Sequence, residues 1–453
     1  MKICDWQMGG HQLDLHAICE FVAIGFFLDD STFYSNIRTL PPAASYNLEG
    51  GRISDLKPRW NWNYNPRDIS LKQATEEFAQ VFEKVANDGL EGKKVILPIS
   101  GGLDSRSQAV ALRNHGNVNS YSYQFDNGFK ETGIAQEIAD KLKYPFKPYY
   151  IKPGYLWSRI EELADINKCF SDFTHPRQMA VKEEIGAMGD VFHLGHWGDV
   201  LFDDMGVAED SSLEERTNLI LKKIIKKGGM ELANSLWQAF GLQGRFEEYL
   251  SDRVASLMSA IKIESGNAHV RAFKSLYWAP RWTSINMAVF SHEKPLVMPF
   301  YRDEICEFIT SVPEKHLAGR QIQIEYMKMA APEVAAVTWQ DYKPFNLYNY
   351  RRHESLTYMP TRAVKKARRL FKEKVLGKKP ATQRNWELQF LGEENKKYLE
   401  GYLFENDSFK ELVPQELVQH FYSKFNSEDR VWYSHPLSML LTLSLFSKRH
   451  FAK

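Results

Sequence analysis

The chain has 453 residues, 43% hydrophobic and 25% charged, which is typical of a globular protein large enough for two or three domains. Its 58 Lys and Arg nearly balance its 57 Asp and Glu, so the overall charge does not favour nucleic acid or a membrane surface as a partner. Its four cysteines include no Cys-x-x-Cys pair. This argues against a zinc ribbon, an iron–sulfur cluster or a disulfide scaffold, and predicts a cytoplasmic protein.

No signal-peptide pattern begins the chain. The longest membrane-like stretch, residues 437–446, is too short to span a bilayer and predicts a buried helix. The first 60 residues predict a helix over 13–27 and a small hairpin around Gly50-Gly51. A segment this short can hardly bury a core of its own, so we expect it to pack on the rest of the chain.

From Ser70 onward, predicted strands alternate with helices. Ser70 and Gln73 match a capping box that opens a helix. Strands are predicted at 95–99, 120–125, 149–151 and 191–194. The alternation predicts an α/β fold with a doubly wound, mostly parallel sheet and helices on both faces. Ligands bind beyond the carboxyl ends of such strands, so Ser100 and Gly195 should face one crevice.

Beyond about residue 200 we expect no further strand. The apolar spacing over 213–258, 272–289 and 346–453 predicts helices. Residues 362–379 form a basic segment with nine Lys or Arg and one acid, Glu373. Such a segment could bind an acidic partner such as a carrier protein, nucleic acid or lipid headgroups, or could simply be a solvated helix.

The most informative stretch is Ser100-Gly101-Gly102-Leu103-Asp104-Ser105, which follows a strand and opens a helix. Its glycines allow positive φ and close approach of a ligand, and successive N–H groups at a helix start favour an anion. Its serines add hydroxyl donors, and Asp104 adds an oxygen ligand suited to Mg²⁺. The stretch matches neither G-x-x-x-x-G-K-[ST] nor G-x-G-x-x-G. It matches S-G-G-x-D-S, the signature of pyrophosphate-loop ATPases; the alternative is an ordinary Gly-Gly turn.

Together with segments elsewhere in the chain, this loop resembles the synthetase half of the asparagine synthetase family. Further segments occur in the order of the family's motifs: 25–27, 32–33 and 37–42 (the tail of its glutaminase domain), Glu131 to Leu142, Gly195 to Phe202, Arg281, Asn286-Met287-Ala288, Pro299-Phe300 and Lys343-Pro344-Phe345. The resemblance implies an adenine nucleotide α-hydrolase-like fold. It divides the chain into a glutaminase-like remnant (1–60), a pyrophosphate-loop synthetase domain (61–345) and a helical C-terminal region (346–453).

The resemblance further implies an adenylate-forming carbon–nitrogen ligase that uses ATP and Mg²⁺. A substrate carboxylate would become an acyl-adenylate, with release of pyrophosphate, and ammonia or an amine would then displace AMP. The implied roles by position are pyrophosphate binding by Ser100, Gly101, Gly102 and Ser105, Mg²⁺ binding by Asp104 and Asp199, adenine binding by Ile99, Tyr123 and Gly195, and phosphate stabilisation by Lys343. The alternatives are a helix N-cap for Asp199 and a surface lysine for Lys343.

The chain departs from the family pattern at its start. Glutamine-using members have a cysteine directly after the initiator methionine, whereas this chain has Lys2, and Cys4 is not terminal. We therefore expect no glutaminase activity. The nitrogen would come from free ammonia, an amine substrate or a separate glutaminase partner.

A second departure lies at Gly195 to Val200. Where the family has Glu-Gly-x-Asp-Glu, this chain has His196-Trp197-Gly198-Asp199-Val200. A neutral His196 could accept a proton from the attacking amine, or could merely pack beside Trp197. His175 is a second candidate pocket residue. The family's usual substrate, aspartate, is therefore not implied.

Two other functions stay open from the sequence. A non-catalytic protein that binds nucleotide to organise a partner complex would explain the loss of both family glutamates. An RNA-modifying pyrophosphate-loop enzyme agrees less well, because thiolating members need a cysteine pair and the net charge is only +1.

Overall fold

The computed structural model of the chain describes residues 12–50, 52–361, 364 and 381–450. Lys2, Cys4 and the basic segment 362–379, apart from Val364, lie outside the described residues. Within the described part, no helix is long and apolar enough to cross a bilayer.

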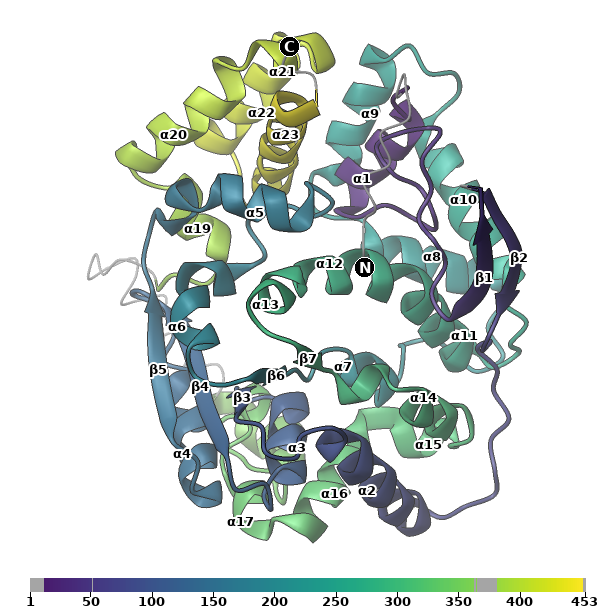
Figure 1. Ribbon diagram of the computed structural model, residues 1–453, viewed down its shortest axis with the longest axis vertical. Helices are drawn as coiled ribbons and strands as arrows, with labels where there is room; N and C mark the ends of the chain where they lie inside the picture. Colours follow the sequence, from purple (N-terminus) through teal and green to yellow (C-terminus); the bar gives the residue numbers. More distant parts are fainter. Residues whose placement is uncertain (1–11, 51, 362–363, 365–380, 451–453) are drawn as a thin grey trace.

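A five-stranded parallel sheet lies in the lower left part of the molecule as drawn in Figure 1. Its spatial order is β5 (Phe146–Ile151), β4 (Val118–Phe125), β3 (Val95–Pro98), β6 (Val191–His193) and β7 (Leu296–Val297). Non-sequential neighbours in a parallel sheet require helical crossovers, so the prediction of a doubly wound α/β fold is confirmed. The expectation of no strand beyond about residue 200 was wrong. β7 is only two residues long, and it is a strand only because it pairs with β6.

Two helical layers cover the sheet. One contains α2 (Leu71–Asn87), α3 (Leu103–Ala111), α4 (Thr132–Leu142), α16 (Gln321–Ala330) and α17 (Pro332–Ala335). The other contains α5 (Ile160–Asn167), α6 (Lys182–Gly186) and α13 (Ala288–Glu293). Because side chains alternate along a strand, Val95 and Leu97 pack in one hydrophobic cluster and Ile96 packs in another with Phe192 and Phe290.

The predicted capping box at the start of α2 is confirmed. Ser70 accepts a hydrogen bond from the Gln73 backbone, and the Gln73 side chain accepts one from the Ser70 backbone. The apolar face of α2 packs inward, with Phe78 and Phe82 fully buried.

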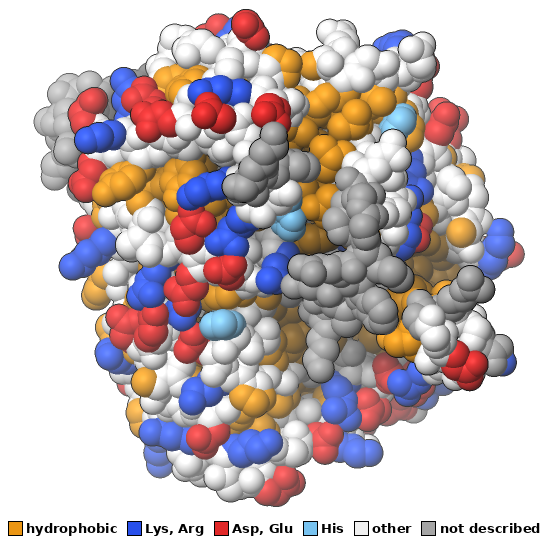
Figure 2. Space-filling model, turned by 45° about the horizontal axis from the view of Figure 1, so that its top comes forward, with side chains coloured by type: hydrophobic (Ala, Val, Ile, Leu, Met, Phe, Trp, Pro, Cys, Tyr) orange, Lys and Arg blue, Asp and Glu red, His pale blue; other side chains and the backbone are white. Residues whose placement is uncertain are grey.

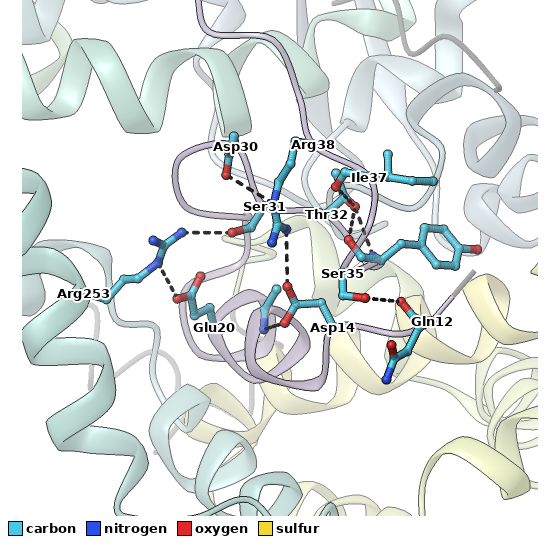
Figure 3. Close-up of polar contacts among 12 residues, drawn as sticks. Gln12, Asp14, Glu20, Asp30, Ser31, Thr32, Ser35, Ile37, Arg38 and Arg253 are labelled. Atoms are coloured by element: carbon cyan, nitrogen blue, oxygen red, sulfur yellow. Dashed lines mark hydrogen bonds and ion pairs between the residues drawn. The ribbon is translucent and has the colours of Figure 1, made fainter. Parts of the chain in front are cut away.

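The helical part of the first 60 residues packs on later helices, as expected, whereas the hairpin that follows is largely exposed. α1 (Leu15–Ile24) lies against α9 (Gly229–Ala239), and β1 (Ala44–Glu49) and β2 (Arg52–Pro58) form the predicted hairpin. A polar network fixes this segment (Figure 3): Glu20 on α1 accepts a 3.0 Å bond from Arg253, which also donates to the Ser31 hydroxyl at 3.0 Å. Arg253 lies on α10 (Phe246–Ala260), so the network joins α1 to the middle of the chain.

The middle of the chain is mainly helical. Its helices include α7 (Gly198–Leu201), α8 (Leu213–Ile224), α11 (Gly266–Phe273), a π-helix (Lys274–Thr283), α12 (Ser284–Asn286), α14 (Asp303–Thr310) and α15 (Glu314–Leu317). Short 3₁₀ turns lie at Tyr155–Ser158, Arg177–Val181, Pro299–Tyr301, Ala318–Arg320, Gln340–Tyr342, Tyr350–Glu354 and Leu356–Tyr358.

The C-terminal helices form a group at the top left of Figure 1: α19 (Asn385–Phe390), α20 (Glu393–Phe404), α21 (Asp407–Leu412), α22 (Gln415–Ser427) and α23 (Arg430–His450). Residues 437–446 are buried within α23, which confirms the predicted buried helix. Phe446 stacks on Phe33 with ring centroids 3.8 Å apart. Figure 2 shows hydrophobic side chains along a hollow between these helices and the α1–α9 side of the molecule.

Candidate functional site

The loop between β3 and α3 is closed by its own serines. The Ser100 and Ser105 hydroxyl oxygens lie 2.9 Å apart, the Ser100 backbone N–H donates to the Ser105 hydroxyl at 3.0 Å, and the Gly102 N–H donates to the Ser100 hydroxyl at 3.3 Å. α3 begins after Gly102, which has no side chain to cap it. The N–H groups of a first helical turn have no intrahelical acceptors, so an anion can bind there.

The glycines of this loop are required for close packing rather than for positive φ. Gly102 has a φ of −81°, and Gly101 is likewise outside the left-handed region, so that part of the prediction was wrong. A Cβ on Gly101 would lie 2.4 Å from the Gln340 side-chain oxygen. Only glycine therefore lets residues around 340 approach the loop this closely.

Arg106 ties the loop to the same distant segment. Its guanidinium is buried and donates to the carbonyls of Val337 at 3.0 Å, Thr338 at 2.7 Å and Gly101 at 3.3 Å. Burial lowers the pKa of Arg106 to about 10, so it keeps its charge at neutral pH. Nothing in the sequence singled it out, because its acceptors are backbone carbonyls far along the chain.

The structure brings Asp104 and Asp199 together at the carboxyl ends of β3 and β6. The Asp199 backbone N–H donates to the Asp104 carboxylate at 3.2 Å. Gly198 makes this approach possible, since a Cβ there would lie 2.2 Å from Asp104 Oδ1. Gly195 also lies next to Asp104: a Cβ at Gly195 would lie 3.3 Å from the Cβ of Asp104. The Asp199 side chain is exposed, so it remains free to accept a ligand.

Arg320 and Gln323, which no pattern in the sequence singled out, hold the Asp104 carboxylate. Arg320 forms an ion pair with Asp104, and the Gln323 amide donates to it at 3.1 Å. Burial raises the pKa of Asp104, while Arg320 opposes the shift and Asp199 adds to it. Arg320 has a φ of +60°, a conformation that costs energy for a residue with a side chain.

These carboxylates suit one kind of metal. Among the described residues, no group of three or more His, Cys, Asp or Glu is arranged to hold an ion. Mg²⁺ does not require such a cage, because it is usually held by one or two carboxylates together with substrate phosphates. The donor set of Asp104 and Asp199 beside an anion-binding loop therefore fits Mg²⁺ with a bound nucleotide.

The residues expected at the adenine lie along the same edge of the sheet. Ile99 is buried, and its N–H donates to the Tyr121 carbonyl at 2.8 Å. Tyr123 is half-buried on β4, with the Arg177 guanidinium carbon 5.2 Å from its ring centroid. Arg177 was not predicted; it is exposed and lies at the start of the turn that follows His175.

His196 and Trp197 occupy the position where the family pattern has Glu-Gly. Burial lowers the pKa of His196 to about 4, and its Nδ1 has no partner within the described part of the chain. His196 is therefore neutral at pH 7 but a weak base. Trp197 has a φ of +82° at the position of the family glycine, and its indole donates to Ser275 at 3.1 Å. Val200, in place of the second glutamate, is buried.

Lys343 and His175 are the two remaining candidate site residues from the sequence. Lys343 is exposed, its backbone N–H donates to the Gln340 carbonyl at 3.4 Å, and it forms no ion pair with the residues that the structure describes. His175 Nδ1 lies 2.7 and 2.8 Å from the two oxygens of buried Asp172. Arg281 is structural, since it donates to the Phe27 carbonyl at 3.3 Å and also bonds the 31–39 segment.

Comparison with known families agrees with this geometry. A family model described as asparagine synthase matches residues 83–323, more than half of the chain. The chain belongs to the asparagine synthase family. Its members are ATP-dependent ligases, and the resemblance stated from the sequence is confirmed.

Within this asparagine synthase family chain, the match includes the loop, Asp199, Arg320 and Gln323, and Lys343 lies beyond its end. No glutaminase domain model matches. A search of curated proteins found no match.

Proposed function

We propose that the protein is an ATP-dependent ligase that joins a carboxylate to ammonia or an amine, releasing AMP and pyrophosphate, without a glutaminase of its own. The observation that supports this most is the hydrogen bond between the Asp199 backbone and the Asp104 carboxylate, 3.2 Å long, directly beside the Ser100–Ser105 loop. Two carboxylates and a helix N-terminus in one place match the requirements of a Mg²⁺–triphosphate.

In this proposal each part of the site has a separate role. The loop N–H groups and the hydroxyls of Ser100 and Ser105 bind the pyrophosphate portion of ATP. Asp104 and Asp199 would hold Mg²⁺, which when bound neutralises phosphate charge. Ile99, Tyr123 and Gly195 line the adenine site, and the exposed Lys343 stabilises charge on the leaving pyrophosphate.

Arg320 adds a role that the sequence did not suggest. Its guanidinium already pairs with Asp104 and lies at the mouth of the loop. A guanidinium matches phosphate oxygens in a bidentate manner. We infer that Arg320 contacts phosphate once Asp104 has a cation to bind.

The second half of the reaction depends on His196. The amine nitrogen attacks the acyl carbon, the bond between that carbon and the AMP oxygen breaks, and the nitrogen releases a proton. A neutral imidazole with a pKa of about 4 holds a proton poorly at pH 7, so His196 orients the amine by hydrogen bonding and the proton passes on to solvent. The nitrogen donor is free ammonia, an amine, or ammonia from a separate glutaminase.

ATP–pyrophosphate exchange tests the first half of the proposed reaction, in which the carboxylate becomes an acyl-adenylate. A panel of carboxylates is incubated with protein, MgATP and labelled pyrophosphate, and exchange into ATP should require one of the carboxylates. Asp104→Asn should lower exchange about 100-fold or more. The matched control is Asp126→Asn, an exposed aspartate at the end of neighbouring β4, which should behave as wild type. Folded protein that binds ATP but exchanges with no carboxylate would refute the proposal.

One observation favours a second candidate, a protein that binds nucleotide without turnover. Both family glutamates are absent, with buried Val200 and a weakly basic His196 in their places. This candidate predicts saturable ATP binding with neither exchange nor AMP release.

A further inference from the structure

A cavity of about 430 Å³ adjoins the candidate site and has no role in the proposed reaction. Segments around residues 203, 320, 341 and 353 line it, and we call it the Tyr342 cavity after the ring in its wall. Arg320, also in the wall, pairs with Asp104, so the cavity lies beside the Ser100–Ser105 loop. A volume of this size can hold a small organic molecule.

Three carboxylates and one guanidinium line the cavity. The carboxylates are those of Asp203, Asp341 and Glu354, and the guanidinium is that of Arg320. Arg320 already has an ion-pair partner and also acts on Asp203. Neither Asp341 nor Glu354 forms an ion pair or a side-chain hydrogen bond with any residue that the structure describes. The cavity therefore attracts a cation and repels an anion such as pyrophosphate.

All three carboxylates act on one half-buried ring, that of Tyr342. Burial raises the pKa of Tyr342, and the negative charges of Glu354, Asp203 and Asp341 raise it further. The acids do not converge on a point, since among the described residues no three His, Cys, Asp or Glu are arranged to hold a metal ion. Carboxylates spread around a ring suit a cation larger than a bare metal ion.

Aromatic rings form the rest of the wall. The Trp339 and Tyr342 ring centroids are 4.3 Å apart with planes 42° from parallel, and those of Tyr342 and His353 are 5.5 Å apart at 78°. Because the rings are tilted, their faces do not fully cover one another. Within the described part of the chain no Lys or Arg lies over Trp339 or Tyr342, whereas Arg351 lies 5.9 Å from the centroid of neighbouring Tyr350. Uncovered aromatic faces beside carboxylates are the chemistry that binds organic ammonium groups.

Trp339 also has an unused hydrogen-bond donor. This wall residue is 4% exposed, and its indole nitrogen has no partner among the residues described. Buried N–H groups are normally hydrogen-bonded, so the indole lacks an acceptor that a ligand oxygen would supply.

We propose that the Tyr342 cavity binds an organic ammonium compound, with its cationic nitrogen against the Tyr342 ring and its charge balanced by Asp341 and Glu354. An oxygen near the nitrogen, as in an amino alcohol, would accept from Trp339. This site goes beyond the proposed ligase function and does not depend on it.

The test is isothermal titration calorimetry of the whole protein without ATP. The probes are choline, butylammonium and putrescine, and 3,3-dimethyl-1-butanol serves as a neutral molecule of the same shape as choline. Ionic strength is held constant, because salt screens exposed charges. At least one of the organic cations should bind saturably with a Kd of about 1 mM or below, and the neutral alcohol should bind about tenfold more weakly than choline.

Variants locate the binding. Tyr342→Leu and the double variant Asp341→Asn with Glu354→Gln should each weaken binding about tenfold or more, and Tyr342→Phe should retain it because the ring face remains. The matched control is Glu333→Gln, an exposed acid on α17 outside the cavity, which should bind as wild type. Unchanged circular dichroism and melting temperature show that each variant is folded.

Three results overturn the proposal. The first is no saturable binding of any organic cation, or equal binding of choline and the neutral alcohol. The second is wild-type affinity in both Tyr342→Leu and the acid double variant. The third is displacement of the bound ammonium compound by equimolar K⁺ or Mg²⁺, which would make this a site for inorganic cations. None of these readouts involves ATP–pyrophosphate exchange, so the cavity and the ligase stand or fall separately.

Discussion

Gly198→Ala is the smallest change that should disable the site. A methyl group at residue 198 would lie 2.2 Å from Asp104 Oδ1, 2.7 Å from its Cγ and 2.9 Å from Phe300. Phe300 is 1% exposed, so its ring has little room to move. The carboxylate of Asp104 must therefore turn away.

The movement can be scaled from ordinary contacts. Carbon and oxygen atoms that are not bonded seldom approach within about 3.2 Å, so the carboxylate must shift by roughly 1 Å. That shift breaks its bond from the Asp199 N–H, 3.2 Å long, and disturbs the Arg320 pair. A misplacement of about 1 Å can lower a rate about 100-fold, and overpacking costs about 1–3 kcal/mol of stability.

The assay is ATP–pyrophosphate exchange together with thermal unfolding. Gly198→Ala should lose about 100-fold in exchange and should melt a few degrees lower. The matched control is Gly133→Ala on α4, where a Cβ would meet nothing within 4 Å, so stability should stay the same or rise slightly. If Gly198→Ala exchanged as fast as wild type, the arrangement of Asp104 and Asp199 would not be the basis of the activity.

Three further predictions test other parts of the molecule. Burial raises the pKa of Glu20 from 4.5 to about 7, so between these values the folded protein holds a proton that the unfolded chain releases. The contribution of Glu20 to the free energy of unfolding is therefore full below about pH 4.5 and falls by about 3 kcal/mol as the pH rises through 7. Urea titrations at several pH values should show that Glu20→Gln reduces this dependence on pH. Arg320→Met leaves Asp104 unpaired and should lower the free energy of unfolding by about 3 kcal/mol in the same urea titrations, and Arg320→Lys should lower it less. Equal stability of wild type and Arg320→Met would contradict the ion pair. Lys343→Ala should lower ATP–pyrophosphate exchange about 100-fold. It should leave the melting temperature unchanged, because the Lys343 side chain is exposed. Exchange at the wild-type rate would show that Lys343 is not part of the site.

Features that depend on neighbouring residues were predictable from the sequence. The capping box at Ser70, the hairpin after residue 44 and the β3–loop–α3 unit each depend on residues within a few positions of one another. Hydrophobic alternation and turn residues act at that range. The approach of Asp104 to Asp199 also followed, because the carboxyl ends of parallel strands share one edge.

Contacts between distant segments were decided only by the tertiary structure. β7 is two residues long and is a strand only through β6, and Arg320 meets Asp104 from 216 residues further along the chain. Lys226 and Lys274 look like any surface lysines until the fold sets both against Trp278. Local patterns fix which elements form, but burial and charge pairing depend on what the whole fold brings alongside, and no short-range signal encodes that.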